Sequence, residues 1–303
     1  MALEPNMLLG ATLAVTAGLL WGGLGVLMSM LARRGIPYPA LTAPSMAFSA
    51  LAAWLLVADH ELLLTGAVPR LGTLTVVMVV SGVLSGLGIN AISAGMRRGH
   101  HAAAWTIGQS ALVLPFLAGV LIFGDQAPIT KCIGVGCILA SVAAFGMGKV
   151  APPAPGVTCV RGAWFFYAVL GLFLLGTHQA LSIVPSYWQG WTDSAHVRIP
   201  LVMSGSAITH SIICAVRRIR VRAAMLKWAV AMCAIILPSL LCIYRAMDLM
   251  AEYRLTAVIY PIAVGTCVLS FALYSALVVR ERIDLFRAAG IVLGVTGIVL
   301  VSL

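Results

Sequence analysis

The chain has 303 residues, of which 61% are apolar and only 9% are charged, and its mean hydropathy is +1.05. About a quarter of an average soluble domain is charged, and a soluble protein of this composition would expose far too much apolar surface. The composition excludes soluble globular, disordered and collagen-like proteins. It predicts an integral membrane protein, in which the net charge of +10 reflects orientation rather than nucleic-acid binding.

Ten apolar runs follow one another along the chain. Most approach the roughly 20 residues that a bilayer-crossing helix needs, and helices are expected because they satisfy their own backbone groups in lipid. The first run is too long for a secretory signal and has no basic stretch before it, so it is predicted to be a true span. The runs cover residues 8–31, 39–58, 72–96, 102–123, 131–148, 162–183, 199–216, 228–247, 255–279 and 288–303.

The middle of the chain carries a proline-rich linker, residues 148–161, with five runs on either side. At an offset of 156 residues the two halves show the same pattern. In each half an acidic residue ends a span, a basic residue follows six positions after it, and a glycine follows nine positions after it. Because five spans per half is odd, the second half enters the membrane from the opposite side. The sequence therefore predicts two inverted five-helix repeats, 1–150 and 151–303. The matched pairs are Asp125 with Glu281, Lys131 with Arg287, and Gly134 with Gly290.

The basic residues are distributed unequally between the two predicted sides. The connections after the first, third, fifth, seventh and ninth runs hold 14 of the 19 Lys and Arg residues, with the densest group at 217–227. Basic loops stay on the cytoplasmic side of a membrane. We therefore expect a multi-pass protein of a cell membrane, bacterial inner membrane by preference, with both termini on the outer side.

The chain resembles the drug/metabolite transporter superfamily, whose members have ten helices in two inverted halves. Within it, Gly86-Leu87-Gly88 and Met96-Arg97 are similar to the L-rhamnose–proton symporter branch. The resemblance implies a central site lined by spans 1, 3, 4, 6, 8 and 9, with spans 5 and 10 peripheral. It also implies a secondary transporter of a neutral monosaccharide or deoxysugar. The superfamily-like residues are Gln109, Pro115, Gly119, Gly124, Asp125, Gly134, Glu281, Gly290 and Gly294.

Polar and aromatic side chains inside the apolar runs are the candidate substrate-binding residues. Polar groups are costly in lipid and usually face a cavity or another helix, while aromatic rings can stack on a sugar. An amide such as Gln109 both donates and accepts hydrogen bonds, although a bond between helices is an equal use for it. The candidates are Trp21, Asn90, Trp105, Gln109, His178, Gln179 and Tyr260.

Two histidines, His178 and His210, are the candidates for proton coupling, because histidine titrates near physiological pH. Acidic residues are expected only at or beyond span ends; Asp248 is one of them. A multidrug pump that needs a membrane-embedded carboxylate is therefore disfavoured. Arg245 is expected to reach the outer surface from its span end.

Other functions remain as alternatives. The nearest is an exporter or exchanger of amino acids or other metabolites with the same fold. A membrane enzyme such as a lipid-modifying transferase would need acidic and histidine residues converging at the membrane surface, and a receptor would need no transport path. We expect no enzyme activity, no cofactor, no metal and no nucleic-acid partner. The expected partners are a small-molecule substrate, protons and lipid, and the expected state is a monomer or homodimer.

Overall fold

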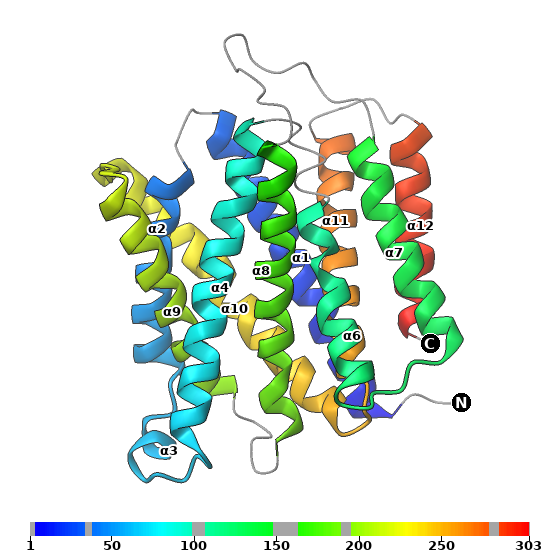
Figure 1. Ribbon diagram of the computed structural model, residues 1–303, viewed down its shortest axis with the longest axis horizontal. Helices are drawn as coiled ribbons and strands as arrows, with labels where there is room; N and C mark the ends of the chain where they lie inside the picture. The colour runs from blue at the N-terminus through cyan, green and yellow to red at the C-terminus, as the bar shows by residue number, and fades with distance from the viewer. Residues whose placement is uncertain are drawn as a thin grey trace.

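The computed structural model describes residues 4–33, 38–98, 107–147, 163–188, 195–278 and 285–302. Every regular element in these ranges is a helix (Figure 1). The main helices are α1 (Pro5–Arg33), α2 (Tyr38–Ala52), α4 (Leu71–Arg98), α6 (Val113–Leu121), α7 (Ile129–Met147), α8 (Ala163–Ile183), α9 (Ala195–Val216), α10 (Leu226–Ala251), α11 (Ile259–Leu277) and α12 (Leu285–Ser302). The short ones are η1 (Ala53–Val57), α3 (His60–Leu64), η2 (Ser110–Leu112), η3 (Val184–Tyr187), η4 (Ala223–Met225) and η5 (Thr256–Val258).

Seven helical segments in the described part of the chain are long and apolar enough to cross a membrane. Three shorter apolar helices accompany them, at Ile107–Leu121, Ile129–Ala144 and Ala288–Val301. Large apolar side chains also lie on the outside of the molecule; Phe166, for example, is 63% exposed. The predicted all-helical class is confirmed, and the long apolar helices are those of a membrane protein.

Two helices extend further than their apolar runs, and each extension includes one charged residue. Helix α9 begins at Ala195 and so includes Arg198, and α10 continues to Ala251 and so includes Asp248. Both side chains are buried. Hydropathy ended each run at the charged residue, but the helix continues because the two charges compensate each other inside the protein.

The helices pack as two bundles. The first bundle is α4, α6, α8 and α9, in which α4 lies against α8 and α9. The second bundle is α1, α2, α10 and α11, in which α1 lies against α10 and α11. Helix α2 also packs against α9 and so connects the bundles, while α7 and α12 pack on each other at the side of α11 (Figure 1).

Glycines allow the closest helix contacts, as their four-residue spacing predicts. A Cβ atom on Gly82 of α4 would overlap the carbonyl oxygen of Val202, and one on Gly205 of α9 would overlap that of Val79. The two glycines thus face each other's helix reciprocally. Gly18 makes the equivalent close approach from α1 to the backbone of α11.

Both ends of the chain lie at the same end of the molecule, which we call the termini end (Figure 1). The loop between α9 and α10 lies at the opposite end and carries the exposed residues Arg217, Arg218, Arg220 and Arg222. The connections from α6 to α7 and from α10 to η5 lie at the termini end, together with η3 (Figure 1). These three segments place the polar contacts of Asp248 and Asp125, described in the next section, at this end.

Candidate functional site

Polar and aromatic side chains of the two bundles meet along their shared interface. We call this set the central tract: the first bundle contributes three of its residues and the second bundle four. It lies among otherwise apolar helices, where an unpaired polar group would be costly. Its members are Ser81, His178 and Ser182, and Trp21, Ser239, Tyr244 and Tyr260.

The aromatic part of the tract is formed by Trp21 and Tyr260. Their rings are stacked, with centroids 6.3 Å apart and planes 19° from parallel. The indole nitrogen of Trp21 donates to Ser239 Oγ over 3.1 Å, so the single polar atom of this large ring has a partner. A ring fixed in this way presents an apolar face of defined position.

The polar part of the tract is centred on Ser81 of α4. Its hydroxyl lies 2.8 Å from Nδ1 of His178 and 3.2 Å from the hydroxyl of Ser182. Ser182 in turn donates to the carbonyl of His178 over 2.8 Å. The side chains of Tyr244 and Tyr260, from the second bundle, lie near Ser182, so the polar groups continue from the first bundle into the second.

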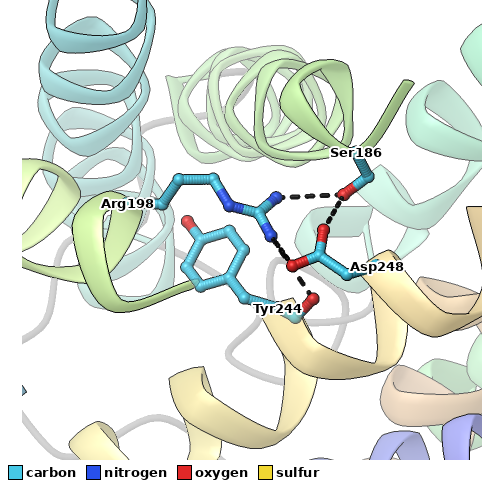
Figure 2. A network of polar contacts seen from close by, with 4 residues as sticks. All are labelled: Ser186, Arg198, Tyr244 and Asp248. Carbon is cyan, nitrogen blue, oxygen red and sulfur yellow. Dashed lines mark hydrogen bonds and ion pairs between the residues drawn. The ribbon is translucent and has the colours of Figure 1, made fainter. Parts of the chain in front are cut away.

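A buried ion pair, Arg198 with Asp248, lies beside Tyr244 of the tract (Figure 2). Nη2 of Arg198 is 2.5 Å from Oδ2 of Asp248, and both side chains are almost completely buried. Ser186 joins the two: its hydroxyl donates to Asp248 Oδ1 over 2.8 Å and accepts from Arg198 Nη1 over 3.0 Å. We call Arg198, Asp248 and Ser186 the charged triad.

Tyr244 connects the charged triad to the central tract. The guanidinium of Arg198 lies 4.8 Å from the centre of the Tyr244 ring, a cation–π contact, and Nη2 also approaches the Tyr244 carbonyl at 3.5 Å (Figure 2). Within the described residues, Nε of Arg198 is buried without a partner. A buried pair is stable only when hydrogen bonds compensate for lost water, and Ser186 and Tyr244 provide that compensation here.

A second buried acid, Asp125, lies in the link between α6 and α7. Its Oδ2 accepts from the hydroxyl of Tyr187 over 2.5 Å and from the backbone N–H of Ala257 over 2.6 Å. The ring of Phe123 stacks on Tyr187 with centroids 4.1 Å apart. Burial raises the pKa of Asp125, against the opposing effects of these two hydrogen bonds and of the nearby Arg254 charge.

The structure brings some of the predicted substrate-binding residues together. Trp21, His178 and Tyr260 belong to the central tract. Gln179 follows His178 in α8, and its buried Oε1 has no partner in the described part of the protein. Gln109 is half-buried directly before η2, away from the contacts of the tract. Trp105 lies outside the described residues.

The two other predicted residues, Asn90 and His210, lie inside the first bundle instead. Nδ2 of Asn90 donates to the Gly86 carbonyl of its own helix over 2.8 Å. Nδ1 of His210 lies 2.9 Å from the Ser206 carbonyl, also in its own helix, and its ring packs beside Gly86. Their partners are backbone groups of the same helix, which is the arrangement of polar residues at a packed α4–α9 interface.

Sequence reasoning missed the charged triad and most hydroxyls of the tract. Serine is common in membrane helices, so Ser81, Ser182 and Ser239 gave no signal above background. Arg198 and Asp248 did carry one: each lies beside an apolar run, and the two run ends are on the same predicted side of the membrane. An unexplained Arg and Asp at the same depth are candidates for pairing.

No cluster of three or more His, Cys, Asp or Glu side chains that could hold a metal ion occurs among the described residues. The groups that are present are hydroxyls, an imidazole, aromatic faces and one neutralised ion pair. Such groups can bind a small solute through hydrogen bonds and ring contacts.

Comparison with known proteins gives information on the fold. No protein-family model matches the chain, and no curated protein matches it. A solved structure described only as the crystal structure of a protein is similar, with a TM-score of 0.68 over 97% of this chain and 98% of that one. Its sequence identity of 15% limits the likeness to the fold. The chain is thus an all-helical protein with membrane-spanning character whose overall fold occurs in a solved structure.

Proposed function

We propose that this protein is a secondary transporter that moves a small neutral polar solute between its two bundles by alternating access. The single observation that carries the proposal is the central tract. Its stacked Trp21 and Tyr260 come from the second bundle and its bonded Ser81, His178 and Ser182 from the first, and Tyr260 lies near Ser182. A site built from both bundles is the arrangement that rocking of one against the other requires.

The packing of the helices supports an inverted repeat within a ten-span protein. The proposed counterparts are α1 with α8, α2 with α9, α4 with α10, α6 with α11, and α7 with α12. Exchanging counterparts converts the α4–α8 contact into α10–α1, α4–α9 into α10–α2, and α6–α8 into α11–α1. It converts the α2–α9 and α7–α12 contacts into themselves. These five contacts are the ones that repeated halves would share, whereas the α11–α12 contact has no comparable α6–α7 counterpart.

A monosaccharide or deoxysugar such as rhamnose is the proposed substrate class. Aromatic faces suit the apolar face of a sugar ring, and neutral hydroxyl and imidazole groups suit its hydroxyls. Proton coupling is part of the proposal, with His178 as the carrier because it belongs to the tract, whereas His210 bonds to its own helix. We place the protein in a cell membrane with the termini end outside, since the described basic loop between α9 and α10 lies at the other end.

An exporter or exchanger of amino acids is the second candidate, and the charged triad favours it. An amino acid carries one positive and one negative group, and Arg198 and Asp248 could each exchange its present partner for one of them. This candidate requires the pair to open in the presence of solute. The neutral-solute proposal requires no charged contact with the solute.

Counterflow in proteoliposomes tests the proposal. Vesicles loaded with unlabelled rhamnose, fucose or glucose should take up the labelled sugar, and an inward proton gradient should increase its accumulation. His178→Gln should abolish the effect of the gradient, whereas His210→Gln should leave it. A panel of amino acids distinguishes the second candidate. If neither sugars nor amino acids exchange across vesicles that contain folded protein, the transport proposal fails.

A further inference from the structure

Two polar links join the bundles at the termini end. The first is the charged triad: Arg198 and Ser186 belong to the first bundle or its extension η3, and Asp248 belongs to α10 of the second. The second is centred on Asp125, which follows α6 of the first bundle and accepts from the N–H of Ala257 at the start of the second bundle's α11 segment. Both links therefore cross the interface that contains the central tract.

Backbone contacts reinforce the second link. The N–H of Gln126 donates to the carbonyl of Arg254 over 2.9 Å, beside the Asp125–Ala257 bond. The link from Ala251 to η5 is turned sharply enough to hold Arg254 at φ 53°, and Gly124 opposite it has φ 70°. Two tight turns, one from each bundle, are thus fixed against each other.

The two links lie between the central tract and the termini end, where they would block a solute that moves from one to the other. Tyr244 lies near Ser182 of the tract, and the Arg198 guanidinium lies over its ring. Tyr260 of the tract begins α11 directly after η5, which contains Ala257. A solute in contact with Tyr260 would thus meet both links before reaching the solution at the termini end.

We propose that Asp248 and Asp125 are the closing residues of a gate at the termini end, and that the solute enters or leaves there only when both links are broken. The proposal rests on the transport function above and identifies the residues that would alternate. When the bundles separate at this end, the ion pair between Arg198 and Asp248 breaks and both side chains become hydrated. The packing of α2 and η1 on α9, with Nε1 of Trp54 in η1 bonded to Ser204 Oγ over 2.9 Å, keeps the bundles joined during that movement.

The charges that face the gate come from several helices. Asp248 faces Arg198 of α9 and has Arg245 nearby on its own helix. Asp125 has Arg254 and Lys131 within electrostatic range. Each acid therefore has bases beside it that offset its charge in the closed gate. Opening exposes each of these charges to water. The gate therefore has two states, a closed one in which the charges are paired and an open one in which water solvates them.

Hydrogen–deuterium exchange of the full-length protein in detergent tests the gate without any solute. Asp248→Asn and Asp125→Ala should each increase exchange at least ten-fold in residues 184–188 and 253–258. Exchange in residues 217–225, at the opposite end, should stay unchanged. Asp59→Ala is the matched control, because Asp59 is an acid at the termini end that caps α3 by accepting from Leu62 N–H. It should accelerate exchange only in its own helix.

If Asp248→Asn does not fold, Arg198→Lys weakens the same link while keeping both charges, and Asp125→Ala tests the other link. Unchanged exchange at 184–188 and 253–258 in folded variants would overturn the gate. Equal acceleration at both ends would also overturn it, since that would mark a general loss of stability.

Separate measurements of solute binding and of counterflow distinguish failure of the gate proposal from failure of the transport proposal. Asp248→Asn should retain binding of the solute that wild-type protein exchanges while its counterflow falls at least ten-fold, because the closed state is lost. Parallel loss of binding and counterflow would show a structural role only and contradict the gate. If wild-type protein binds no solute, the transport proposal fails, whereas the exchange experiment still decides whether the acids close this end.

Discussion

Ser186 and Tyr187, consecutive residues of η3, donate hydrogen bonds to two different buried carboxylates. Ser186 bonds to Asp248 of α10 over 2.8 Å, and Tyr187 bonds to Asp125 after α6 over 2.5 Å. One short turn at the end of α8 therefore holds both acids of the proposed gate. Displacement of this turn would weaken both links at once.

The buried ion pair should respond to mutation in a non-additive way. Removing one partner leaves an uncompensated charge, so Asp248→Asn should lower the free energy of unfolding by roughly 3–5 kcal/mol. Replacing both, as Arg198→Met with Asp248→Leu, should recover much of that loss because no charge remains buried. The measurement is unfolding of the single and double variants by titration from mild detergent into SDS. Additive losses would contradict the strong coupling of the two side chains.

The close contact between α4 and α9 should not accept a methyl group. Gly82→Ala places its Cβ against the Val202 carbonyl, and overpacking of this kind should cost about 1–3 kcal/mol of stability. Gly136→Ala is the matched control: its Cβ would meet no atom within 4 Å in mid-helix α7, so it should be neutral or slightly stabilising. Thermal unfolding in detergent compares the two, and equal effects would be inconsistent with the described packing.

The stacked rings of the tract should affect solute affinity. Trp21→Phe keeps an aromatic face but loses the bond to Ser239, whereas Trp21→Ala loses both. The Phe variant should raise the apparent KM for counterflow several-fold, and the Ala variant should raise it by more than ten-fold. Trp164→Phe, at the start of α8, is a tryptophan control remote from the tract and should leave KM unchanged. A KM that is insensitive to Trp21 would remove it from the proposed site.

Asp125 should make stability depend on pH. Burial raises its pKa in the folded protein, so the folded state holds the proton more tightly than the unfolded state, whose carboxyl titrates at about 3.9. The contribution of the protonated form is therefore present below that value and is lost as pH rises through the raised folded pKa. Asp125→Asn should abolish this part of the slope. Thermal midpoints of both proteins between pH 3.5 and 7 measure it, and identical slopes would contradict the assignment.

The fold class follows from composition and run length, because lipid requires helices that satisfy their own backbone. The helix ends were less predictable. Hydropathy counts each charge as a penalty, so it could not recognise that Arg198 and Asp248 neutralise each other within α9 and α10.

The residues of the candidate site also differ in how far the sequence could indicate them. The sequence by itself named Trp21, His178 and Tyr260 among its candidates, because the polar atom of each ring needs a partner inside an apolar run. Only the tertiary structure separated them from Asn90 and His210, whose Nδ2 and Nδ1 atoms pair with carbonyls of their own helices, while Nε2 of His210 is buried without a partner in the described part of the protein. Side-chain direction and partner helix are fixed by packing between residues as much as 218 positions apart, as in Trp21–Ser239. The sequence alone therefore determines which side chains need a polar partner, while the packing of the two bundles decides which partner each one has.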